Sequence, residues 1–206
     1  MRLVQIDGLW WPKSDEVCRD AVLSEVVTAV PWFLSHCKGR DLIVQAGGNV
    51  GVYPLELAKH FHKIYTVEPD PENFEALMRN FWPPTPRRWA INAALGAFKS
   101  TCDMVKPEAH NCGAHRIDDG DELDVIAIDH LALEACDAIW LDVEGSELPA
   151  LKGARKTIER FHPVIATEEK GIGRHYGYDD ADIGEFLAKF GYSFVSSHGN
   201  DRLYKV

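Results

Sequence analysis

The sequence predicts a doubly wound α/β fold built on a mostly parallel sheet. Short apolar runs typical of strands alternate with amphipathic segments of helical period along most of the chain. Two of these runs end in loops rich in glycine and carboxylates. The 206 residues, 46% hydrophobic and 26% charged, fit one globular domain overall. Within it we expect residues 1–40 to form an N-terminal arm and helix packed on a domain of residues 41–206.

Charge and cysteine content restrict the partners and the compartment. The net charge of −10 and the pI near 5.3 argue against a nucleic acid held mainly by phosphate contacts. The five cysteines are scattered without a C-x-x-C pair, which is typical of a reducing compartment. No run has the form of a signal peptide or the length of a membrane helix. We expect a soluble, cytoplasmic protein without a membrane partner, and the oligomeric state stays open.

The first half of the chain predicts elements separated by turn and capping residues. Trp10 and Trp11 either cover the sheet edge or mark an interface or a substrate wall. The predicted elements are a strand or arm at 3–12, a helix capped by Ser14 that Pro31 ends or kinks, a strand at 41–47, a helix at 51–62, a strand at 64–70, and a helix capped by Asp70 that buries Phe74, Leu77, Met78 and Phe81.

The second half continues the alternation after a small insertion. Its final hairpin adds an antiparallel strand to the sheet. The predicted elements are a strand and loop at 89–96, an inserted antiparallel pair at 101–106 and 124–128 around a polar loop at 108–122, a strand at 138–142, a helix capped by Ser146 or Gly145, a strand at 163–169, a helix starting at Asp179 or Asp180, and a hairpin at 192–206.

The stretch LIVQAGGNVG, residues 42–51, is a buried strand that breaks into a glycine turn and opens a helix. Such turns present backbone N–H groups to a cofactor. The turn does not form a strict G-x-G-x-x-G, because Ala46 occupies the first position. Glu68 ends the next strand 17 residues after Gly51, near the spacing at which a carboxylate binds ribose hydroxyls. A purely structural turn is the alternative.

A third strand ends in the loop D-V-E-G-S-E, which begins at Asp142. Parallel strands end at one edge of their sheet, and ligands bind at that edge in open α/β folds. We therefore expect the loops after residues 47, 68 and 142 to converge on one site.

Several segments together resemble the FkbM-type family of S-adenosylmethionine-dependent methyltransferases. They are VQAGGNVGVYPLELA, YTVEPDPENFEAL, INAALG, and WLDVEGSELPALKGA followed by HPVIATEE. They cover most of residues 42–169 in the expected order, and D-V-E-G-S-E-L-x-A-L-K-G-A is the most specific. The resemblance implies a class I, Rossmann-like, seven-stranded methyltransferase sheet with a reversed last strand.

The resemblance also implies which residues bind S-adenosylmethionine and its product S-adenosylhomocysteine. Glu68, with Pro69 beside it, would bind both ribose hydroxyls. The residues implied to pass the methionine part are Gly47, Gly48, Asn49 and Gly51, and those flanking the adenine are Ala93 and Ala94.

Gln45 departs from the family pattern, which usually has an acidic residue at this position. Glutamine can accept a hydrogen bond but supplies no charge, so either cofactor affinity is lower or Asp142 binds the ammonium instead. If the family pattern applies, Gln45→Asp should tighten cofactor binding.

Methyl transfer to an alcohol needs an aligned nucleophile and a group that removes its proton. Asp142 is the first candidate to deprotonate or orient the acceptor, with Glu144 and Glu168 as neighbours and His115 as a further base. Glu144 alternatively caps the next helix, and His115 alternatively lies on a surface loop. The three carboxylates can also gather a divalent cation, but no spacing requires it and none is predicted. Residues 171–178 form either a mobile substrate-side loop or an ordinary connection.

The leading hypothesis is an O-methyltransferase acting on a small acceptor, such as a sugar or a natural-product alcohol. A nicotinamide-dependent oxidoreductase shares the glycine turn and the ribose carboxylate, but it does not require the D-V-E-G-S-E loop. A cofactor-binding module without turnover is the third hypothesis, because Gln45 lacks the usual charge.

Overall fold

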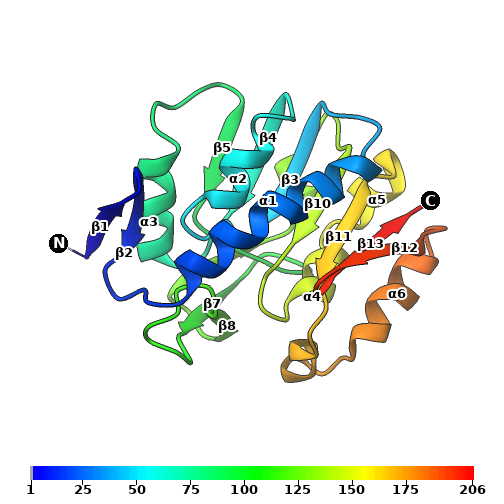
Figure 1. Ribbon diagram of the computed structural model, residues 1–206. Helices are drawn as coiled ribbons and strands as arrows, with labels where there is room; N and C mark the ends of the chain where they lie inside the picture. Colours follow the sequence, from blue (N-terminus) through cyan, green and yellow to red (C-terminus); the bar gives the residue numbers. More distant parts are fainter. Residues whose placement is uncertain (1) are drawn as a thin grey trace.

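The computed structural model describes residues 2–206 and is built around a seven-stranded mixed sheet (Figure 1). Its strands are β3 (Leu42–Ala46), β4 (Lys63–Val67), β5 (Arg88–Ile91), β10 (Ala138–Leu141), β11 (Val164–Glu168), β12 (Ser193–His198) and β13 (Asp201–Lys205). The order across the sheet is β12-β13-β11-β10-β3-β4-β5. The four pairings from β11 to β5 are parallel, whereas β13 is antiparallel to β11 and β12. The predicted mostly parallel sheet with an antiparallel last strand is confirmed.

Helices cover both faces of this sheet. They are α1 (Cys18–His36), α2 (Val52–Leu57) and α3 (Pro71–Asn80) on one face, and α4 (Glu147–Lys152), α5 (Arg155–Phe161) and α6 (Asp180–Ala188) on the other. Because strand side chains alternate, Ile43 packs toward the first face while Leu42 and Val44 pack toward the second. The apolar strand runs are therefore fully buried.

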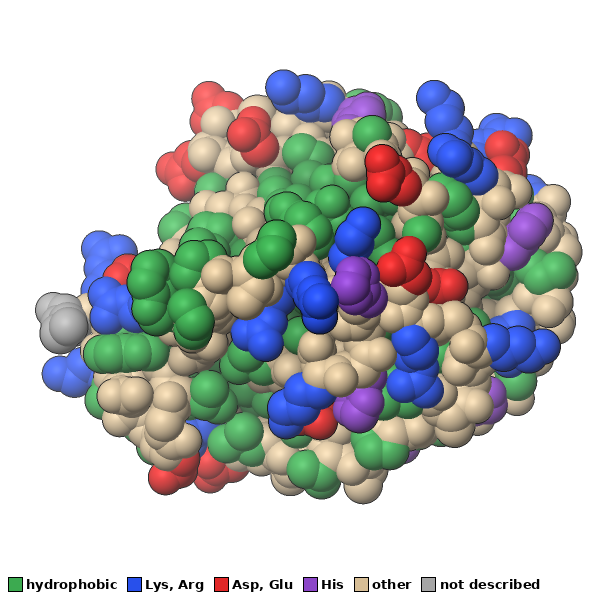
Figure 2. Space-filling model, turned by 90° about the horizontal axis from the view of Figure 1, so that it is seen from above, with side chains coloured by type: hydrophobic (Ala, Val, Ile, Leu, Met, Phe, Trp, Pro, Cys, Tyr) green, Lys and Arg blue, Asp and Glu red, His purple; other side chains and the backbone are tan. Residues whose placement is uncertain are grey.

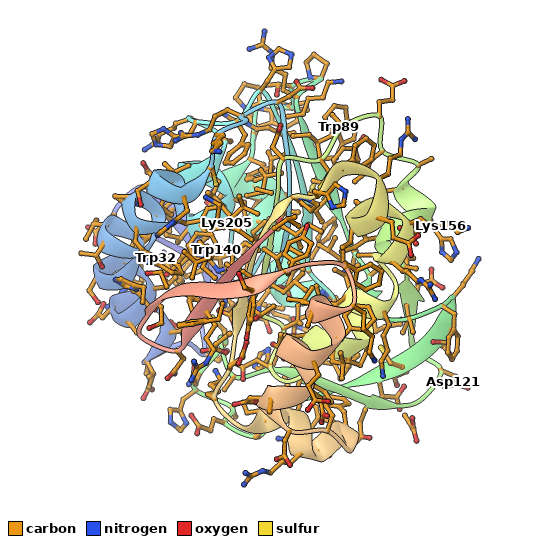
Figure 3. All side chains as sticks on the ribbon, turned by 90° about the vertical axis from the view of Figure 1, so that its right-hand side faces the viewer. Trp32, Trp89, Asp121, Trp140, Lys156 and Lys205 are labelled. Carbon is orange, nitrogen blue, oxygen red and sulfur yellow. The ribbon has the colours of Figure 1, made fainter. Side chains whose placement is uncertain are left out.

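Helix α1 crosses the sheet and is held by aromatic packing. Trp32 of α1 and Trp140 of β10 point toward each other in Figure 3, with ring centroids 6.3 Å apart. Pro31 lies inside α1, which continues to His36, so of the two predicted alternatives the one in which Pro31 ends the helix is wrong. Burial of residues on both sides of the proline keeps the last turns in place. Asp15, not Ser14, accepts hydrogen bonds from the first backbone N–H groups of the helix.

Further helix predictions need correction. Helix α2 ends at Leu57, well before His62, and the Met78 side chain of α3 is 46% exposed. The helix after the D-V-E-G-S-E loop is split into α4 and α5. The chain there passes so close to Gly96 that a Cβ on Gly153 would lie 2.0 Å from its carbonyl oxygen. The Ser146 hydroxyl donates to the Val143 carbonyl instead of capping α4.

The N-terminal hairpin of β1 (Leu3–Ile6) and β2 (Leu9–Pro12) packs on α3. The Asn80 side chain accepts from the Trp10 N–H at 2.7 Å and donates to the Trp10 carbonyl at 3.0 Å. Trp11 is buried and Trp10 is half-buried. The two tryptophans therefore pack against the protein and do not form an exposed pair.

The insertion forms a second sheet at the end of the molecule where the parallel strands end (Figure 1). Its strands, in the order β6-β9-β7-β8, are β6 (Ala94–Leu95), β9 (Leu123–Ile126), β7 (Ser100–Val105) and β8 (Arg116–Asp119). The predicted antiparallel pair is present as β7 and β9. The predicted polar loop contains β8, an edge strand in which charged residues leave no alternation of apolar and polar side chains.

Short helical turns complete the chain: η1 (Ile128–Leu131) follows the insertion, and η2 (Ile172–Tyr176) follows β11.

Figure 2 looks onto the end of the molecule opposite the insertion, where basic and histidine side chains gather. This is the end at which the parallel strands begin, β4 with Lys63 and β5 with Arg88. Within residues 2–206, every helix is too short or too polar to traverse a lipid bilayer.

Candidate functional site

A cavity of about 420 Å³ opens where the parallel strands end, beneath the insertion. Among the predicted site residues, those that line it are Gly47, Gly48, Asn49, Glu68, Pro69, Ala93, Ala94, His115, Asp142 and Glu144. Gln45, Gly51 and Glu168 do not line it. The expected convergence of three strand ends is therefore present in the fold, with three residues of the predicted set behind the cavity wall.

The glycine turn brings the ends of β3 and β10 together. Gly47 has φ +78°, and a Cβ there would lie 1.8 Å from the Asp142 carbonyl oxygen, so no larger residue fits. The N–H groups of Gly47 and Gly48 donate to the Val67 carbonyl at 3.1 and 3.0 Å. Gly51, with φ +100°, starts α2 outside the cavity. The turn thus fixes the spacing between the first and third strand ends.

Glu68 follows β4 and is fixed by backbone donors. Its Oε2 accepts from the Asn49 N–H at 2.7 Å, and its Oε1 accepts from the Asp70 N–H at 2.9 Å. Burial raises the pKa of Glu68 to about 7, and these two donors oppose the rise. Each carboxylate oxygen keeps a second lone pair, so the group can accept bonds from two neighbouring hydroxyls in the cavity.

Asp70 anchors the insertion to the start of α3. Its Oδ1 accepts from the Glu72 and Asn73 N–H groups, while Oδ2 lies 2.6 Å from Lys106 Nζ and 2.9 Å from His115 Nδ1. Burial raises the pKa of Asp70, but the contacts with His115 and Lys106 outweigh it and hold the pKa well below its usual range. His115, which lines the cavity, therefore contacts the Asp70 carboxylate and holds the insertion against the start of α3.

Gln45 supports the glycine turn from behind. Its Nε2 donates to the Ala46 carbonyl at 3.1 Å and the Gly47 carbonyl at 2.9 Å. Its Oε1 accepts from Thr66 Oγ1 at 2.6 Å, and the residue is only 2% exposed. Both ends of the Gln45 side-chain amide are hydrogen-bonded inside the protein, and its donor end holds the backbone of the glycine turn.

The other end of the cavity carries a cluster of charged side chains. Carboxylate oxygens of Asp142, Glu144 and Glu168 lie within 4.8 Å of one another. Lys170 Nζ lies 2.9 Å from Glu144 Oε1 and 2.7 Å from Glu168 Oε2. Burial alone would lower the pKa of Lys170, but the nearby Glu168, Asp142 and Glu144 raise it, so the ammonium stays charged.

Asp142 and Glu168 titrate together. The Asp142 side chain is exposed to solvent through the cavity that it lines. Burial and the charge of Glu144 raise the pKa of Asp142 to about 7, against the opposing charge of Lys170. Burial and Asp142 raise the pKa of Glu168 further, to about 9. Because the two groups are coupled, they titrate as a pair above the usual range of carboxyl groups, and Asp142 is the member that lines the cavity.

The D-V-E-G-S-E loop is held by a buried carboxyl group. Glu147 Oε1 accepts from the Val143 and Gly145 N–H groups at 3.1 and 3.2 Å. The Tyr178 hydroxyl donates to the Gly145 carbonyl at 2.7 Å, and burial raises the pKa of Glu147 to about 7. Glu144 is paired with Lys170 and does not cap α4. Glu147, the last residue of the loop, thus holds the loop backbone in place at Val143 and Gly145.

Among the cavity-lining residues that sequence reasoning missed are Tyr53, Arg116 and Lys170. Lys170 could have been found, because carboxylates predicted at two neighbouring strand ends need a cation and it follows Glu168 by two positions. Arg116 lies in the least periodic section of the chain, which offers no signal. Part of the predicted substrate-side loop, Ile172 in η2, does line the cavity.

Comparisons with known proteins agree with this arrangement. The family model described as the methyltransferase FkbM domain matches residues 45–194. The hexuronic acid methyltransferase AglP of Haloferax volcanii is 23% identical over 189 residues, covering 85% of this chain and 73% of that protein.

Solved structures show the same fold. A methyltransferase FkbM from Methylobacillus flagellatus superimposes with a TM-score of 0.59 at 23% identity, covering 81% of this chain but only 44% of that one. The chain thus spans less than half of that protein. Magnesium protoporphyrin IX methyltransferase from Synechocystis, solved with bound S-adenosylmethionine, gives a TM-score of 0.51 at 14% identity, over 90% of this chain and 79% of its own.

These likenesses establish an α/β methyltransferase-like fold with a mixed sheet. The family match takes in the glycine turn, Glu68 and the loop after β10, which are the three strand ends that meet at the cavity. Since this match covers well over half of its length, the chain belongs to the FkbM methyltransferase family.

Proposed function

We propose that this protein transfers the methyl group of S-adenosylmethionine to a hydroxyl of a small acceptor, a sugar or a natural-product alcohol. One observation carries the proposal: the glycine turn, Glu68 and Asp142 line a single cavity. The first two suit a nucleoside cofactor, and the third supplies a proton acceptor beside it.

The cofactor end of the cavity fits an adenosyl group with an amino-acid tail. Glu68 presents a carboxylate held by two backbone donors, as a pair of ribose hydroxyls requires. Ala93 and Ala94 supply small apolar surface in the same wall. The volume of about 420 Å³ lies within the range of small-molecule sites. When bound, S-adenosylmethionine would supply an electrophilic methyl group on a sulfonium.

The residues at the other end have the chemistry to handle the acceptor. Asp142 can accept the proton of an acceptor hydroxyl, because its pKa of about 7 lies near neutral pH. Lys170 ties Glu144 to Glu168 beside it. Since this ammonium already supplies a positive charge between the carboxylates, the proposal includes no metal ion.

The sugar as acceptor is supported by the relative from Haloferax volcanii, which is named for hexuronic acid. We also propose that residues 1–40 fold with residues 41–206 as one domain, because α1 and the N-terminal hairpin share a core with β3 and β10.

The direct test is methyl transfer from isotopically labelled S-adenosylmethionine to a panel of sugars, sugar acids and alcohols. We expect transfer to at least one hydroxylated class by the wild type, and a loss of roughly 10²- to 10⁴-fold in Asp142→Asn. Asp20→Asn, an exposed change on α1, should leave the rate unchanged.

Two outcomes would favour the other hypotheses. Binding of S-adenosylhomocysteine without transfer to any acceptor would indicate a binding module. A thermal shift with NAD but none with S-adenosylmethionine would indicate an oxidoreductase.

A further inference from the structure

Three basic side chains line the cavity: His115, Arg116 and Lys170. His115 Nδ1 lies 2.9 Å from Asp70, and Lys170 Nζ lies within 2.9 Å of both Glu144 and Glu168. Two of the three basic side chains therefore lie close to carboxylates of the protein itself.

Arg116 is the exception. Its Nε is buried and has no hydrogen-bond partner, and no carboxylate of residues 2–206 forms an ion pair with its guanidinium. A buried donor without a partner costs roughly 1–3 kcal/mol, and more when it is charged. The cavity wall thus contains a guanidinium that has no ion-pair partner in the described part of the chain and whose Nε–H is unsatisfied, and an anionic ligand would supply both.

The surroundings of Arg116 place it toward the loop that carries Asp142. The residue after it, Ile117, accepts a hydrogen bond from the Tyr176 hydroxyl of η2 at 2.7 Å. Burial and the charge of Glu147 raise the pKa of Tyr176, and the charge of Arg116 opposes them, so the guanidinium acts on that hydroxyl.

The same turn of helix contacts the Asp142 loop. Ile172 of η2 lines the cavity and packs against Gly145, where an added Cβ would lie 2.5 Å from its side chain. Arg116, η2 and the loop after β10 therefore border one part of the cavity.

We propose that Arg116 binds a carboxylate of the acceptor, and hence that the acceptors are hydroxylated acids of the sugar-acid class. This rests on the proposed function and names its substrate class. A guanidinium is planar and matches a carboxylate with two parallel hydrogen bonds, which selects for charge and orientation together. Such a bond would hold the acceptor at one end while its hydroxyl meets Asp142.

The test measures binding of three related sugars to the protein saturated with S-adenosylhomocysteine, by ligand-observed NMR titration. The probes are D-glucuronate, D-glucose and D-glucosamine, which differ in charge. We expect glucuronate to bind about tenfold or more tightly than the other two, because a charge-assisted pair contributes about 1.5–3 kcal/mol. Raising the salt concentration should reduce this preference only partly, since the pair is enclosed.

Variants identify the residue responsible. Arg116→Gln should remove the preference for glucuronate, whereas Arg116→Lys should retain part of it as a point charge. Arg155→Gln, an exposed change at an ion pair with Glu159 on α5, should retain all of it. In all three variants the affinity for S-adenosylhomocysteine should stay within about twofold of the wild type, which also reports on correct folding.

Three results would overturn the inference: no preference for glucuronate in the wild type, an unchanged preference in Arg116→Gln, or a large loss of S-adenosylhomocysteine affinity in that variant. The last would assign the guanidinium to the carboxylate of the cofactor. Failure of S-adenosylhomocysteine to bind the wild type is a separate result, which counts against the proposed function itself.

Discussion

The two ends of the cavity are built in different ways. At the Glu68 end, the Glu68 carboxylate is held by backbone N–H groups of Asn49 and Asp70, close to the ends of β3 and β4. At the Asp142 end, charged side chains hold one another: Lys170 joins Glu144 and Glu168, and Arg116 has no internal partner. The first end is therefore set by the fold, while the second depends on charge and protonation.

This difference determines which changes should affect each end. Backbone geometry is shared by every conformation of the folded protein, so the Glu68 end should respond mainly to steric changes. Side-chain charges respond to pH and substitution, so the Asp142 end should be altered with little loss of cofactor affinity.

The largest effect is expected where the two ends touch. Gly47→Ala would place a Cβ 1.8 Å from the Asp142 carbonyl oxygen, at φ +78°. We expect loss of S-adenosylhomocysteine binding by more than about 100-fold and a fall of several kcal/mol in the free energy of unfolding, measured by calorimetry and urea denaturation.

The matched control is Gly177→Ala, because Gly177 has φ +79° with no atom within 4 Å of its Cβ position. It should cost only about 1–2 kcal/mol of backbone strain and leave binding unchanged. Equal losses of binding in the two variants would show that strain, not the contact with Asp142, is responsible.

Glu68→Gln should weaken S-adenosylhomocysteine binding by about 10- to 100-fold, because hydrogen bonds to a charged acceptor contribute about 1.5–3 kcal/mol. The pKa of Glu68 is about 7, and the ionised form is the better acceptor, so wild-type affinity should rise as the pH rises from 6 to 8.

Glu68→Gln should lose this pH dependence, and Glu75→Gln, an exposed change on α3, should keep it. A pH-independent affinity in the wild type would contradict a role for the Glu68 carboxylate in binding.

Stability should also depend on pH through the buried acid of the D-V-E-G-S-E loop. The pKa of Glu147 is about 7 in the folded protein, above the unfolded value of about 4.3, so the native state binds more protons between these values. Its contribution to the free energy of unfolding is therefore present below about pH 4 and is lost as the pH rises through 7.

Glu147→Gln should flatten this dependence by on the order of 1–3 kcal/mol in urea denaturation series at pH 5 and 8. Glu159→Gln, which changes an exposed carboxylate, should leave the slope unchanged. An unaltered slope in Glu147→Gln would mean that Glu147 is ionised throughout.

The smallest effect concerns Gln45, and the structure reverses the sign expected from the family pattern. Gln45→Asp would remove two hydrogen bonds donated to the Ala46 and Gly47 carbonyls and would bury a charge beside them. We expect cofactor affinity a few-fold weaker, with Gln5→Asp, an exposed change in β1, as the control. Tighter binding would restore the family-based expectation.

The contrast between the Glu68 end and the Asp142 end also explains which parts of the cavity the sequence predicts. The Glu68 end was predictable because strand, turn and carboxylate are adjacent in sequence and their spacing is fixed by the fold. The internal hydrogen bonds of Gln45 were not predictable, because sequence gives its position in β3 but not the direction of its hydrogen bonds. Asp142 was predictable from the loop motif.

The partners of the Asp142 end were harder to predict. Lys170 and Arg116 come from a strand end and an insertion 54 positions apart, and only tertiary packing brings both to the cavity. Strand β8, which carries Arg116, has too few apolar residues to give a period. Pairings among exposed polar segments leave little trace in a single sequence.

Calorimetric titration of the wild-type protein with S-adenosylhomocysteine and S-adenosylmethionine tests the central claim most directly, with NAD titrated in parallel. We predict one-to-one binding of both adenosyl compounds and none of NAD. Absence of binding to both would contradict the assignment of the cavity between Glu68 and Asp142 as a methyl-donor site.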